Sequence, residues 1–421
     1  MAPPPALARR LGLGDAVFLG LGSMIGAGVF SAFAPAAAAA GSALLIGLAV
    51  AAAVAFCNAT ASAQLAAAHP TSGGTYAYGR AELGAWWGFV AGWCFVIGKL
   101  ASCAAMALTF AAYAAPAGWE RPVAIVAVAA LVTVNCFGVT RTAQVTRGIV
   151  VVVLLTLAAV VAAGAAAGAL PDWWSDAPSA DAAGAYGILQ SAGLLFFAFA
   201  GYARIATMGE EVRNPARTIP RAIVLALSIT VAVYAAVAVT VLAVLGPQGT
   251  AASAAPLADA AAASGWGWTQ PVVRIGAAAA SLGALLALIA GIGRTTLAMA
   301  REDDLPRFLA AVHPRWHVPR RAEIAIGIVV ITTVALVDLR GAIGFSSFGV
   351  LVYYFIANAA AFRQAAGARR YPRVLQVLGL LGCATLVITL PVVAVAVGVI
   401  LVLAGVAYRF ARLRIMRTPP R

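Results

Sequence analysis

Long apolar runs dominate this sequence and restrict it to the folds that a lipid bilayer allows. The chain is 63% hydrophobic and only 10% charged, a composition typical of proteins with many membrane spans. A helix needs about 20 apolar residues to cross the hydrocarbon core. We therefore expect an all-α integral membrane protein with twelve transmembrane helices, at 15–38, 42–67, 84–115, 121–139, 146–169, 185–208, 220–245, 270–299, 322–338, 342–362, 373–390 and 391–408.

Arginine is distributed very unevenly between the loops that join these runs. If the N-terminus is cytoplasmic, 22 arginines fall in cytoplasmic segments and two, Arg121 and Arg340, fall outside. Cytoplasmic loops of membrane proteins carry such an excess. The bias predicts a multi-pass protein of the cytoplasmic membrane with both termini in the cytoplasm. It explains the net charge of +14 better than a nucleic-acid partner does. We expect the arginine-rich tail to lie on anionic membrane lipid.

Cysteines and catalytic motifs give little sign of other chemistry. The five cysteines lie in apolar runs and are interpreted as small buried hydrophobes, not as disulfides or metal ligands; they are Cys57, Cys94, Cys103, Cys136 and Cys383. We find no phosphate-binding loop, nucleophile elbow or metal cluster. The sequence therefore predicts a protein that is not an enzyme and needs no cofactor or metal.

Glycines interrupt the first predicted span in its middle. Gly20, Gly22, Gly26 and Gly28 fall within nine residues and weaken helix propensity. The sixth span carries Gly201 among aromatic residues. Interrupted helices at equivalent places in two halves indicate an inverted-repeat transporter, whose unwound backbone can bind a carboxylate and an ammonium group. The alternative is that these glycines only let neighbouring helices pack closely.

A series of short motifs resembles the amino acid–polyamine–organocation (APC) transporter superfamily. In chain order these are GSMIGAGVF at 22–30, PTSGGTYAY at 70–78, NCFGV at 135–139, FFAFAGY at 196–202, GEEVRNPARTIP at 209–220 and MAREDDLP at 299–306. The resemblance implies a single transporter domain, 1–421, with a five-plus-five inverted-repeat (LeuT-like) fold and broken helices 1 and 6. Repeat one would cover about 14–169, repeat two about 184–365, and helices 11 and 12 about 372–409. It also implies secondary transport of amino acids or related amines.

The same resemblance places the substrate at the two broken helices. The substrate carboxylate would meet the unwound part of helix 1, at Ser23, Met24, Gly26, Ala27 and Gly28. The amino group would meet carbonyls of the helix 6 break, at Phe197, Ala198, Ala200 and Gly201, with Phe199 and Tyr202 as gate or pocket aromatics. The alternative for the two aromatic side chains is ordinary packing.

Lys99 is the one lysine of the chain, against 27 arginines, and lies in the middle of the third predicted span. It is about ten residues, or about 15 Å, from either end of the apolar run, a distance that snorkelling hardly covers. We expect it to face the bundle interior or water. Many proton-dependent members of the family carry a lysine in helix 5, where counting gives Val153 here. Lys99 is therefore the predicted coupling residue.

Three roles remain open for Lys99. A neutral amine could bind the transported proton. A permanently protonated amine could replace a sodium ion or pair with the substrate carboxylate. A lysine bonded to freed backbone carbonyls would have no role in transport.

The remaining charges bear on the gate and on the substrate. The predicted gate or structural charges are Arg204, Glu210, Glu211 and Arg294. No Asp or Glu lies in the middle of a predicted span, so we expect a neutral amino acid as substrate, although cation–π binding could hold a cation without a carboxylate. Proton-coupled symport is the leading interpretation. Exchange, sodium coupling through helix 8 hydroxyls at Ser281, Thr295 or Thr296, and a channel or sensor are the alternatives. The oligomeric state stays open.

Overall fold

The computed structural model describes residues 11–69, 73–138, 143–168, 180–206, 208 and 211–417. These ranges fold almost entirely into helices and contain no strand, only an isolated bridge between Leu11 and Val212. The helices are α1 (Leu13–Met24), α2 (Ala27–Ser31), α3 (Phe33–Ala40), α4 (Leu44–Ala68), α5 (Gly74–Leu83), α6 (Ala85–Ala114), α7 (Glu120–Cys136), α8 (Ala143–Ala166), α9 (Ala180–Phe199), α10 (Ala203–Ala206), α11 (Pro215–Ala252), α12 (Pro256–Ala263), α13 (Thr269–Arg301), α14 (Arg320–Leu336), α15 (Leu339–Arg363), α16 (Arg373–Thr389) and α17 (Val392–Arg417).

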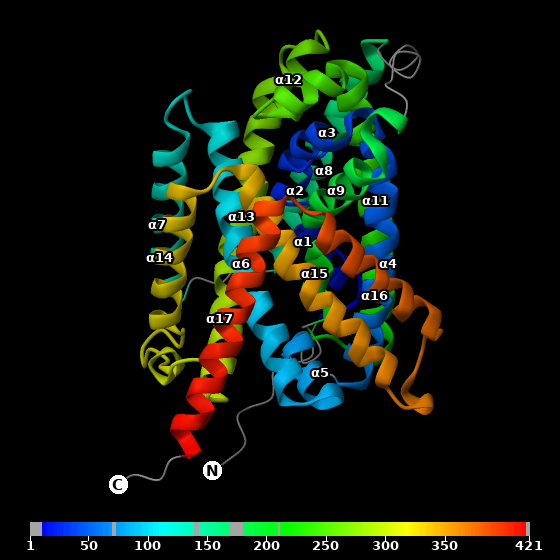
Figure 1. Ribbon diagram of the computed structural model, residues 1–421. Coiled ribbons are helices and arrows are strands. Elements are labelled where there is room, and N and C mark those ends of the chain that lie inside the picture. Colours follow the sequence, from blue (N-terminus) through cyan, green and yellow to red (C-terminus); the bar gives the residue numbers. More distant parts are fainter. Residues whose placement is uncertain are drawn as a thin grey trace.

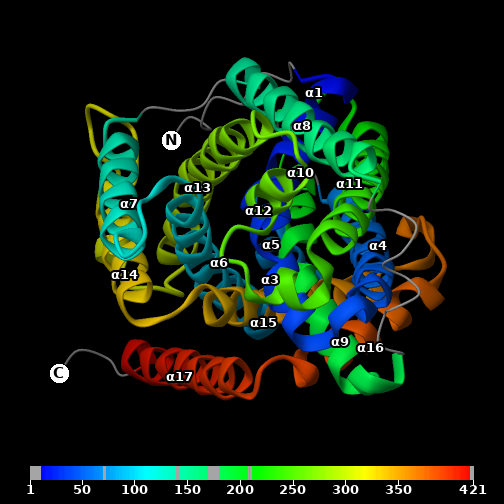
Figure 2. The same ribbon diagram turned by 90° about the horizontal axis from the view of Figure 1, so that it is seen from above.

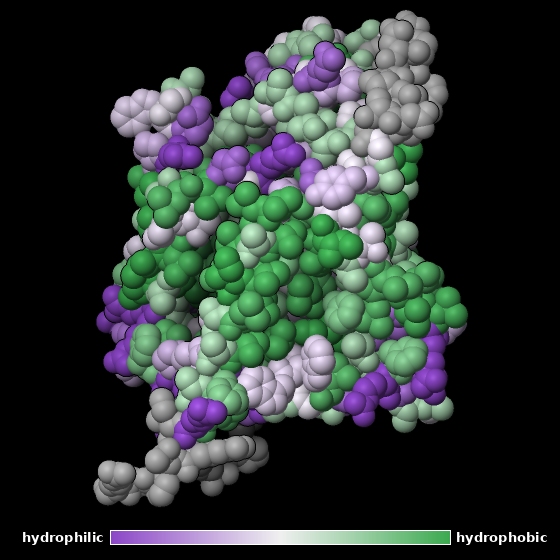
Figure 3. Space-filling view, in the orientation of Figure 1, coloured by the Kyte–Doolittle hydropathy of each residue, from purple (hydrophilic) through white to green (hydrophobic). Residues whose placement is uncertain are grey.

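Within the described residues, nine helical segments are long and apolar enough to cross a membrane. Three further helices, α7, α14 and α16, have 17 residues each and lie at the fourth, ninth and eleventh predicted spans. Figure 3 shows a broad apolar band across the middle of the molecule, with hydrophilic side chains gathered toward both ends. Exposed Leu155, Ile328 and Leu403 contribute to the apolar surface. Such a surface suits lipid rather than water, and the chain is a multi-pass membrane protein.

The helices pack in two groups. The first packing group comprises α1–α4 and α9–α11, and its apolar core includes Phe30, Leu48 and Leu227. The second packing group comprises α6, α7, α13 and α14, with a separate core that includes Leu108 and Ile289. Figure 2 shows the two groups on opposite sides, with α15 between them. The two cores meet where the groups adjoin, because Phe197 of α9 lies in the second core and Val273 of α13 lies in the first.

Small residues allow the closest contact between the second packing group and α15. A Cβ on Gly98 of α6 would lie 3.1 Å from the Cα of Gly349 on α15. Beside this contact, the hydroxyls of Ser102 and Ser346 are 2.6 Å apart. Small-residue contacts of this kind are typical of membrane helices, because packing has to replace the hydrophobic effect between them. The two ends of the molecule are named here after α5 and α12, which lie at opposite ends in Figure 1.

Candidate functional site

The first predicted span is interrupted where its glycines predict it. Helix α1 ends at Met24 and α2 begins at Ala27. Between them Ile25 has φ −82° and ψ 56°, and Gly26 has φ −104° and ψ −137°, both outside the helical region. Helix α2 continues almost directly into α3, so the interruption is a short irregular segment in the middle of one long apolar element.

The sixth predicted span is interrupted differently from the first. Helix α9 ends at Phe199, a 3₁₀ turn covers Ala200–Tyr202, and α10 follows from Ala203. Phe197 and Ala198, which the sequence places in an unwound segment, are still helical. The helix is wound more tightly here for one turn and is not unwound. A 3₁₀ turn in the middle of a helix often marks a functional hinge.

The two interruptions touch each other through their backbones. A Cβ on Gly201 would lie 2.1 Å from the carbonyl oxygen of Ser23. A Cβ on Gly28 would lie 2.6 Å from the Cα of Ala198. Only glycine fits at these two positions, because in both cases the obstacle is backbone that cannot move aside. The structure thus brings together the helix 1 and helix 6 residues that the resemblance assigns to the substrate.

Two buried tyrosines donate hydrogen bonds to the carbonyls at this crossing. The hydroxyl of Tyr234, from α11, lies 2.6 Å from the carbonyl oxygen of Met24 and 3.0 Å from that of Ala198. The hydroxyl of Tyr354, from α15, lies 3.3 Å from the carbonyl oxygen of Ala200. One hydroxyl proton is therefore shared between the two interrupted helices. Carbonyls that the sequence leaves free for a substrate amine already have donors.

Sequence reasoning missed Tyr234 and Tyr354. The available signal was that each carries a hydroxyl into an apolar run, and a buried tyrosine hydroxyl usually finds a partner. The rings of these two tyrosines also pack against the two aromatic residues that the sequence predicts at the site. Phe199 packs on Tyr234 with ring centroids 5.1 Å apart, and Tyr202 stacks on Tyr354 at 4.8 Å. Phe199 and Tyr202 are both buried, so the structure supports the packing alternative for these two side chains.

The remaining helix 1 residues lie along the same crossing. Met24, Gly26, Ala27 and Gly28 are buried, while the Ser23 hydroxyl donates to the Leu19 carbonyl at 2.9 Å. A Cβ on Gly26 would lie 3.0 Å from the Cβ of Ala284 on α13. The helix 1 interruption therefore lies between α9 of the first packing group and α13 of the second.

Lys99 is buried in α6 with 7% of its surface exposed. It lies one turn before Cys103 on the same helix face, because residues four apart are neighbours. Cys103 belongs to the core that contains Phe197 and Ile289, so this face points toward α9 and α13. Among the described residues, no carboxylate pairs with Lys99 and no carbonyl accepts a hydrogen bond from it. A structural lysine would need hydrogen bonds to backbone carbonyls, and none is present for Lys99 among these residues.

Three of the four predicted gate charges can be placed. Arg204, on α10, interacts electrostatically with Arg294 of α13 and with Glu211. Glu210 lies outside the described residues. Arg294 also interacts with Glu323, a carboxylate of α14 that is 2% exposed and that sequence reasoning left out. These charges extend from the first packing group into the second, between α10, α13 and α14.

Few side chains among the described residues are placed to bind a metal cation. The described residues hold no group of three or more His, Cys, Asp or Glu side chains placed for a metal ion. The hydroxyls of Ser281 and Thr296 are buried without a hydrogen-bond partner among the described residues. Ser281 lies one turn from Ala284, the residue that faces Gly26. Thr296 lies fifteen residues further along α13, so of these two hydroxyls only that of Ser281 is available to a sodium ion near Gly26. Thr295 donates to the Gly291 carbonyl at 3.3 Å.

The five cysteines are free thiols, and all of them are buried, as their apolar surroundings predict. Two arginines of the arginine-rich tail differ from its prediction. Arg409 and Arg412 turn inward and pair with Asp304 and Asp303, which follow α13. These two arginines are therefore part of the protein's own packing rather than a lipid contact.

Comparisons with known proteins agree with this architecture. A model of the amino acid permease family matches residues 11–412. An uncharacterized transporter of Mycobacterium tuberculosis is 59% identical over 96% of this chain and 91% of its own length. The chloroplastic cationic amino acid transporter 7 of Arabidopsis thaliana is 27% identical over 85% of this chain and 65% of its own length. The branched-chain amino acid permease BcaP of Bacillus subtilis is 26% identical over 75% of this chain and 72% of its own length. Because the family model matches nearly the whole chain, the protein belongs to the amino acid permease family of membrane transporters.

Proposed function

We propose that this protein is a secondary active transporter that carries neutral amino acids across the cytoplasmic membrane by alternating access. The observation that carries the proposal is the direct backbone contact between two interrupted helices, at Gly201 with Ser23 and at Gly28 with Ala198. Irregular backbone in the middle of a membrane is tolerated where it lines a cavity or a binding site. This contact lies in the first packing group and faces the second at Gly26, next to Ala284 of α13, and the two packing groups are the bodies that would move.

The proposed arrangement has twelve spans in a single domain, 1–421, with five-plus-five inverted repeats at about 14–169 and 184–365 and two further helices at about 372–409. Helices α7, α14 and α16 supply the three shorter spans. The arginine bias favours cytoplasmic termini. The α5 end is then the cytoplasmic end, because Arg80, Arg307 and Arg409 lie there in predicted cytoplasmic segments.

In the proposed binding mode, the substrate occupies the crossing of the two interruptions. Its carboxylate meets helix 1 between Ser23 and Gly28, and its ammonium group meets the carbonyls of helix 6 between Phe197 and Gly201. Because Tyr234 and Tyr354 already donate to Ala198 and Ala200, the ammonium group shares or replaces these donors. Binding is then an exchange of hydrogen bonds, which favours a substrate whose amine has the geometry of an α-amino acid.

The charge of the site favours a neutral side chain. Lys99 lies on the face of α6 that borders the core containing Phe197, and its protonated form would repel a cationic side chain. Relatives of this chain are named for cationic and for branched-chain amino acids, so a cationic substrate is the second candidate. A cation would bind here through the face of an aromatic ring rather than through a carboxylate.

The proposed coupling ion is the proton, and the proposed carrier is Lys99. It is buried, and among the described residues it has no ion-pair partner, so its charged form is costly at this depth. An amine in such a place can be neutral or protonated depending on its surroundings, which an arginine cannot. Sodium coupling at Ser281 is the alternative within the same function, and obligatory exchange is another.

Uptake into proteoliposomes tests the proposal directly. Labelled leucine, alanine, glutamate and arginine are offered to the purified protein while the pH and sodium gradients are varied separately. We expect concentrative uptake of a neutral amino acid driven by an inward proton gradient, with faster exchange when the same amino acid is preloaded. Uptake driven by sodium and indifferent to pH would contradict proton coupling. Downhill flux without acceleration by preloaded substrate would indicate a channel, and binding without flux would indicate a sensor.

A further inference from the structure

We propose that α16 and α17 form a strap that joins the two packing groups, with the junction at Leu390 and Pro391 as its hinge. In this proposal α16 moves with the first packing group and α17 moves with the second. The strap rests on the proposed alternating-access function, because it acts only if the two groups move relative to each other. Its role is to limit how far they separate.

Helix α16 packs on α15, and it is also attached to α9 and α4, both in the first packing group. The side-chain amide of Gln190, on α9, donates to the Thr389 carbonyl at 3.1 Å. The thiol of Cys383 donates to the side-chain oxygen of Asn58, on α4, at 3.4 Å. A Cβ on Gly382 would lie 2.7 Å from the Val54 side chain of α4. Polar contacts and close packing therefore hold the second half of α16 to this group.

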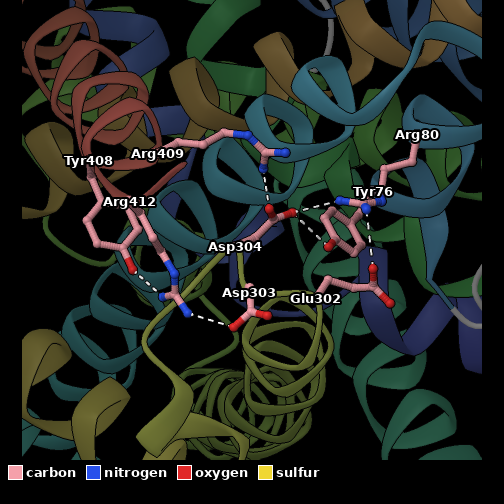
Figure 4. A network of polar contacts seen from close by, with 8 residues as sticks. All are labelled: Tyr76, Arg80, Glu302, Asp303, Asp304, Tyr408, Arg409 and Arg412. Atoms are coloured by element: carbon pink, nitrogen blue, oxygen red, sulfur yellow. Dashed lines mark hydrogen bonds and ion pairs between the residues drawn. The ribbon is translucent and has the colours of Figure 1, made fainter. Parts of the chain in front are cut away.

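Helix α17 packs on α15, where a Cβ on Gly398 would meet the Phe348 ring. It is also attached to α6 and to the segment that follows α13, both in the second packing group. The indole nitrogen of Trp93, on α6, donates to the Leu401 carbonyl at 2.9 Å. A Cβ on Gly405 would lie 2.5 Å from the Trp93 ring. One further turn along, Arg409 pairs with Asp304 and Arg412 pairs with Asp303 at 2.9 Å (Figure 4). Like that of α16, this attachment combines a hydrogen bond to a backbone carbonyl with close packing, and it adds two ion pairs.

The ion pair at Asp304 is the more buried of the two ion pairs that hold α17. The side chains of Asp304 and Arg409 are 5% and 8% exposed, so water competes little with the pair. Figure 4 shows that Arg80 and Tyr76 of α5 reach the same carboxylate from the other side, at 3.0 and 2.9 Å. The guanidinium of Arg409 also stacks over the ring of Phe89, 4.7 Å from its centroid. Removing one partner of a buried pair leaves an uncompensated charge, so α17 is firmly held here.

The junction between the two helices has the features of a hinge. Helix α16 ends at Thr389 and α17 begins at Val392. Leu390 has φ −59° and ψ 162°, outside the helical region, and Pro391 cannot donate a helical hydrogen bond. Figures 1 and 2 show the two helices diverging from this point, α16 toward the first packing group and α17 along the second. A change in the angle between the groups would be taken up at these two residues.

Distance measurements between spin labels test the strap in the full-length protein. Labels are placed in pairs on exposed sites of four helices, Phe56 of α4, Ile328 of α14, Leu381 of α16 and Leu403 of α17. The five native cysteines are buried, so labelling is directed to the introduced ones. Distances are recorded in lipid with and without an equimolar mixture of the proteinogenic L-amino acids. The Phe56–Ile328 pair is the reference, because it spans the two packing groups.

We expect the reference pair and the Leu381–Leu403 pair to change distance when amino acids are added. The Phe56–Leu381 and Ile328–Leu403 pairs should stay constant, because each lies within one moving body. A change within either of these pairs as large as that of the reference would overturn the strap while leaving alternating access intact. A reference distance that never changes would instead contradict alternating access, and the strap would fail with it.

Substitutions at the attachment supply a second test. Arg409→Gln is expected to broaden the Ile328–Leu403 distance distribution and to slow amino acid uptake several-fold, with unchanged substrate affinity. Arg412→Gln should do the same more weakly and keeps the buried pair for folding. Arg321→Gln is the matched control, since Arg321 is exposed on α14 and has no contact of this kind among the described residues. Uptake and distance distributions of Arg409→Gln and Arg412→Gln that match this control would overturn the strap.

Discussion

Lys99 and Asp304 are both buried charges, yet their surroundings are opposite. Asp304 is 4% exposed and receives Arg80, Arg409 and the Tyr76 hydroxyl on its two oxygens. Lys99 is 7% exposed and has no ion-pair partner among the described residues. Asp304 lies at the α5 end, beyond the last turn of α13, whereas Lys99 lies in the middle of α6. One charge is fully compensated and the other is not.

This is the difference expected between a structural charge and the functional charge that we propose for Lys99. A buried ion needs opposite charge and hydrogen bonds to offset its lost hydration, and Asp304 has both. A buried ion without such partners lowers stability, and proteins tolerate this loss where the ion has a functional role. We therefore expect substitutions at Asp304 to act mainly on folding, and substitutions at Lys99 to act mainly on transport.

The largest expected effect is that of Asp304→Asn on stability. It leaves the Arg409 guanidinium buried without its carboxylate, which costs about 3–5 kcal/mol in the free energy of unfolding. Unfolding in mixed micelles with increasing dodecyl sulfate measures it. The double variant Asp304→Asn with Arg409→Gln is the control, and it should lose less than the single variant. If Asp304→Asn were as stable as the double variant, the Arg409 guanidinium would not be left as a costly buried charge, which would contradict a buried ion pair.

Lys99→Met is expected to leave the free energy of unfolding unchanged or to raise it by about 1–4 kcal/mol, because an uncompensated buried charge is replaced by an apolar side chain of similar length. The same micelle titration measures it. Arg274→Met is the control for removing a satisfied membrane cation, since Arg274 donates to the Tyr113 carbonyl at 2.9 Å. A destabilisation by Lys99→Met as large as that by Asp304→Asn would break the contrast, because it would make Lys99 a structural residue.

Tyr234→Phe extends the contrast to uncharged polar groups. It removes the one proton shared by the Met24 and Ala198 carbonyls, and unsatisfied buried groups cost about 1–3 kcal/mol. Amino acid affinity should change with it, because the two interruptions lose their common donor. Equilibrium binding of the transported amino acid measures the effect. Tyr186→Phe, at an exposed site of α9, serves as the control and should bind as the wild type does. If Tyr234→Phe and Tyr186→Phe bound the amino acid with equal affinity, Tyr234 would have no part in substrate binding.

The smallest expected effect concerns pH at the compensated end. Hydrogen bonds from Arg307, and then those from Arg412, lower the pKa of Asp303 to about 2. A lowered pKa means that this ion pair is complete above the ordinary aspartate range and is lost only as the pH falls toward 2. The difference in melting temperature between the wild type and Asp303→Asn should therefore be constant from about pH 5 to 8. If the difference in melting temperature varied between about pH 5 and 8, the ion pair of Asp303 would contribute to the pH dependence of stability in that range, contrary to this prediction.

Much of the helix pattern could be predicted, because apolar length and glycine placement are local properties. The interruption at Gly26 and the division between α16 and α17 at Pro391 both follow from residues within the segment itself. The 3₁₀ turn at Ala200–Tyr202 could not be predicted. Its form depends on Gly201 meeting the backbone of Ser23, which is a contact between distant segments.

The side-chain partners were the least predictable part of the site. Arg409 was expected at the lipid surface because its neighbours in the sequence are basic. Its carboxylate partner, Asp304, is 105 residues away, and nothing local indicates the pairing. Tyr234 was missed for the same reason, since its acceptors belong to α1 and α9. Lys99 could be selected because it is unique in composition, but its lack of partners is a property of the folded chain.

Substrate-driven proton movement tests the central claim about Lys99 most directly. Proteoliposomes contain a pH-sensitive dye, and a transported amino acid is added outside without any imposed gradient. The account predicts that the wild type acidifies the lumen as the amino acid enters. Lys99→Met should still bind the amino acid and exchange it, but without acidification. Acidification by Lys99→Met at the wild-type proton-to-substrate ratio would contradict the assignment of coupling to this residue.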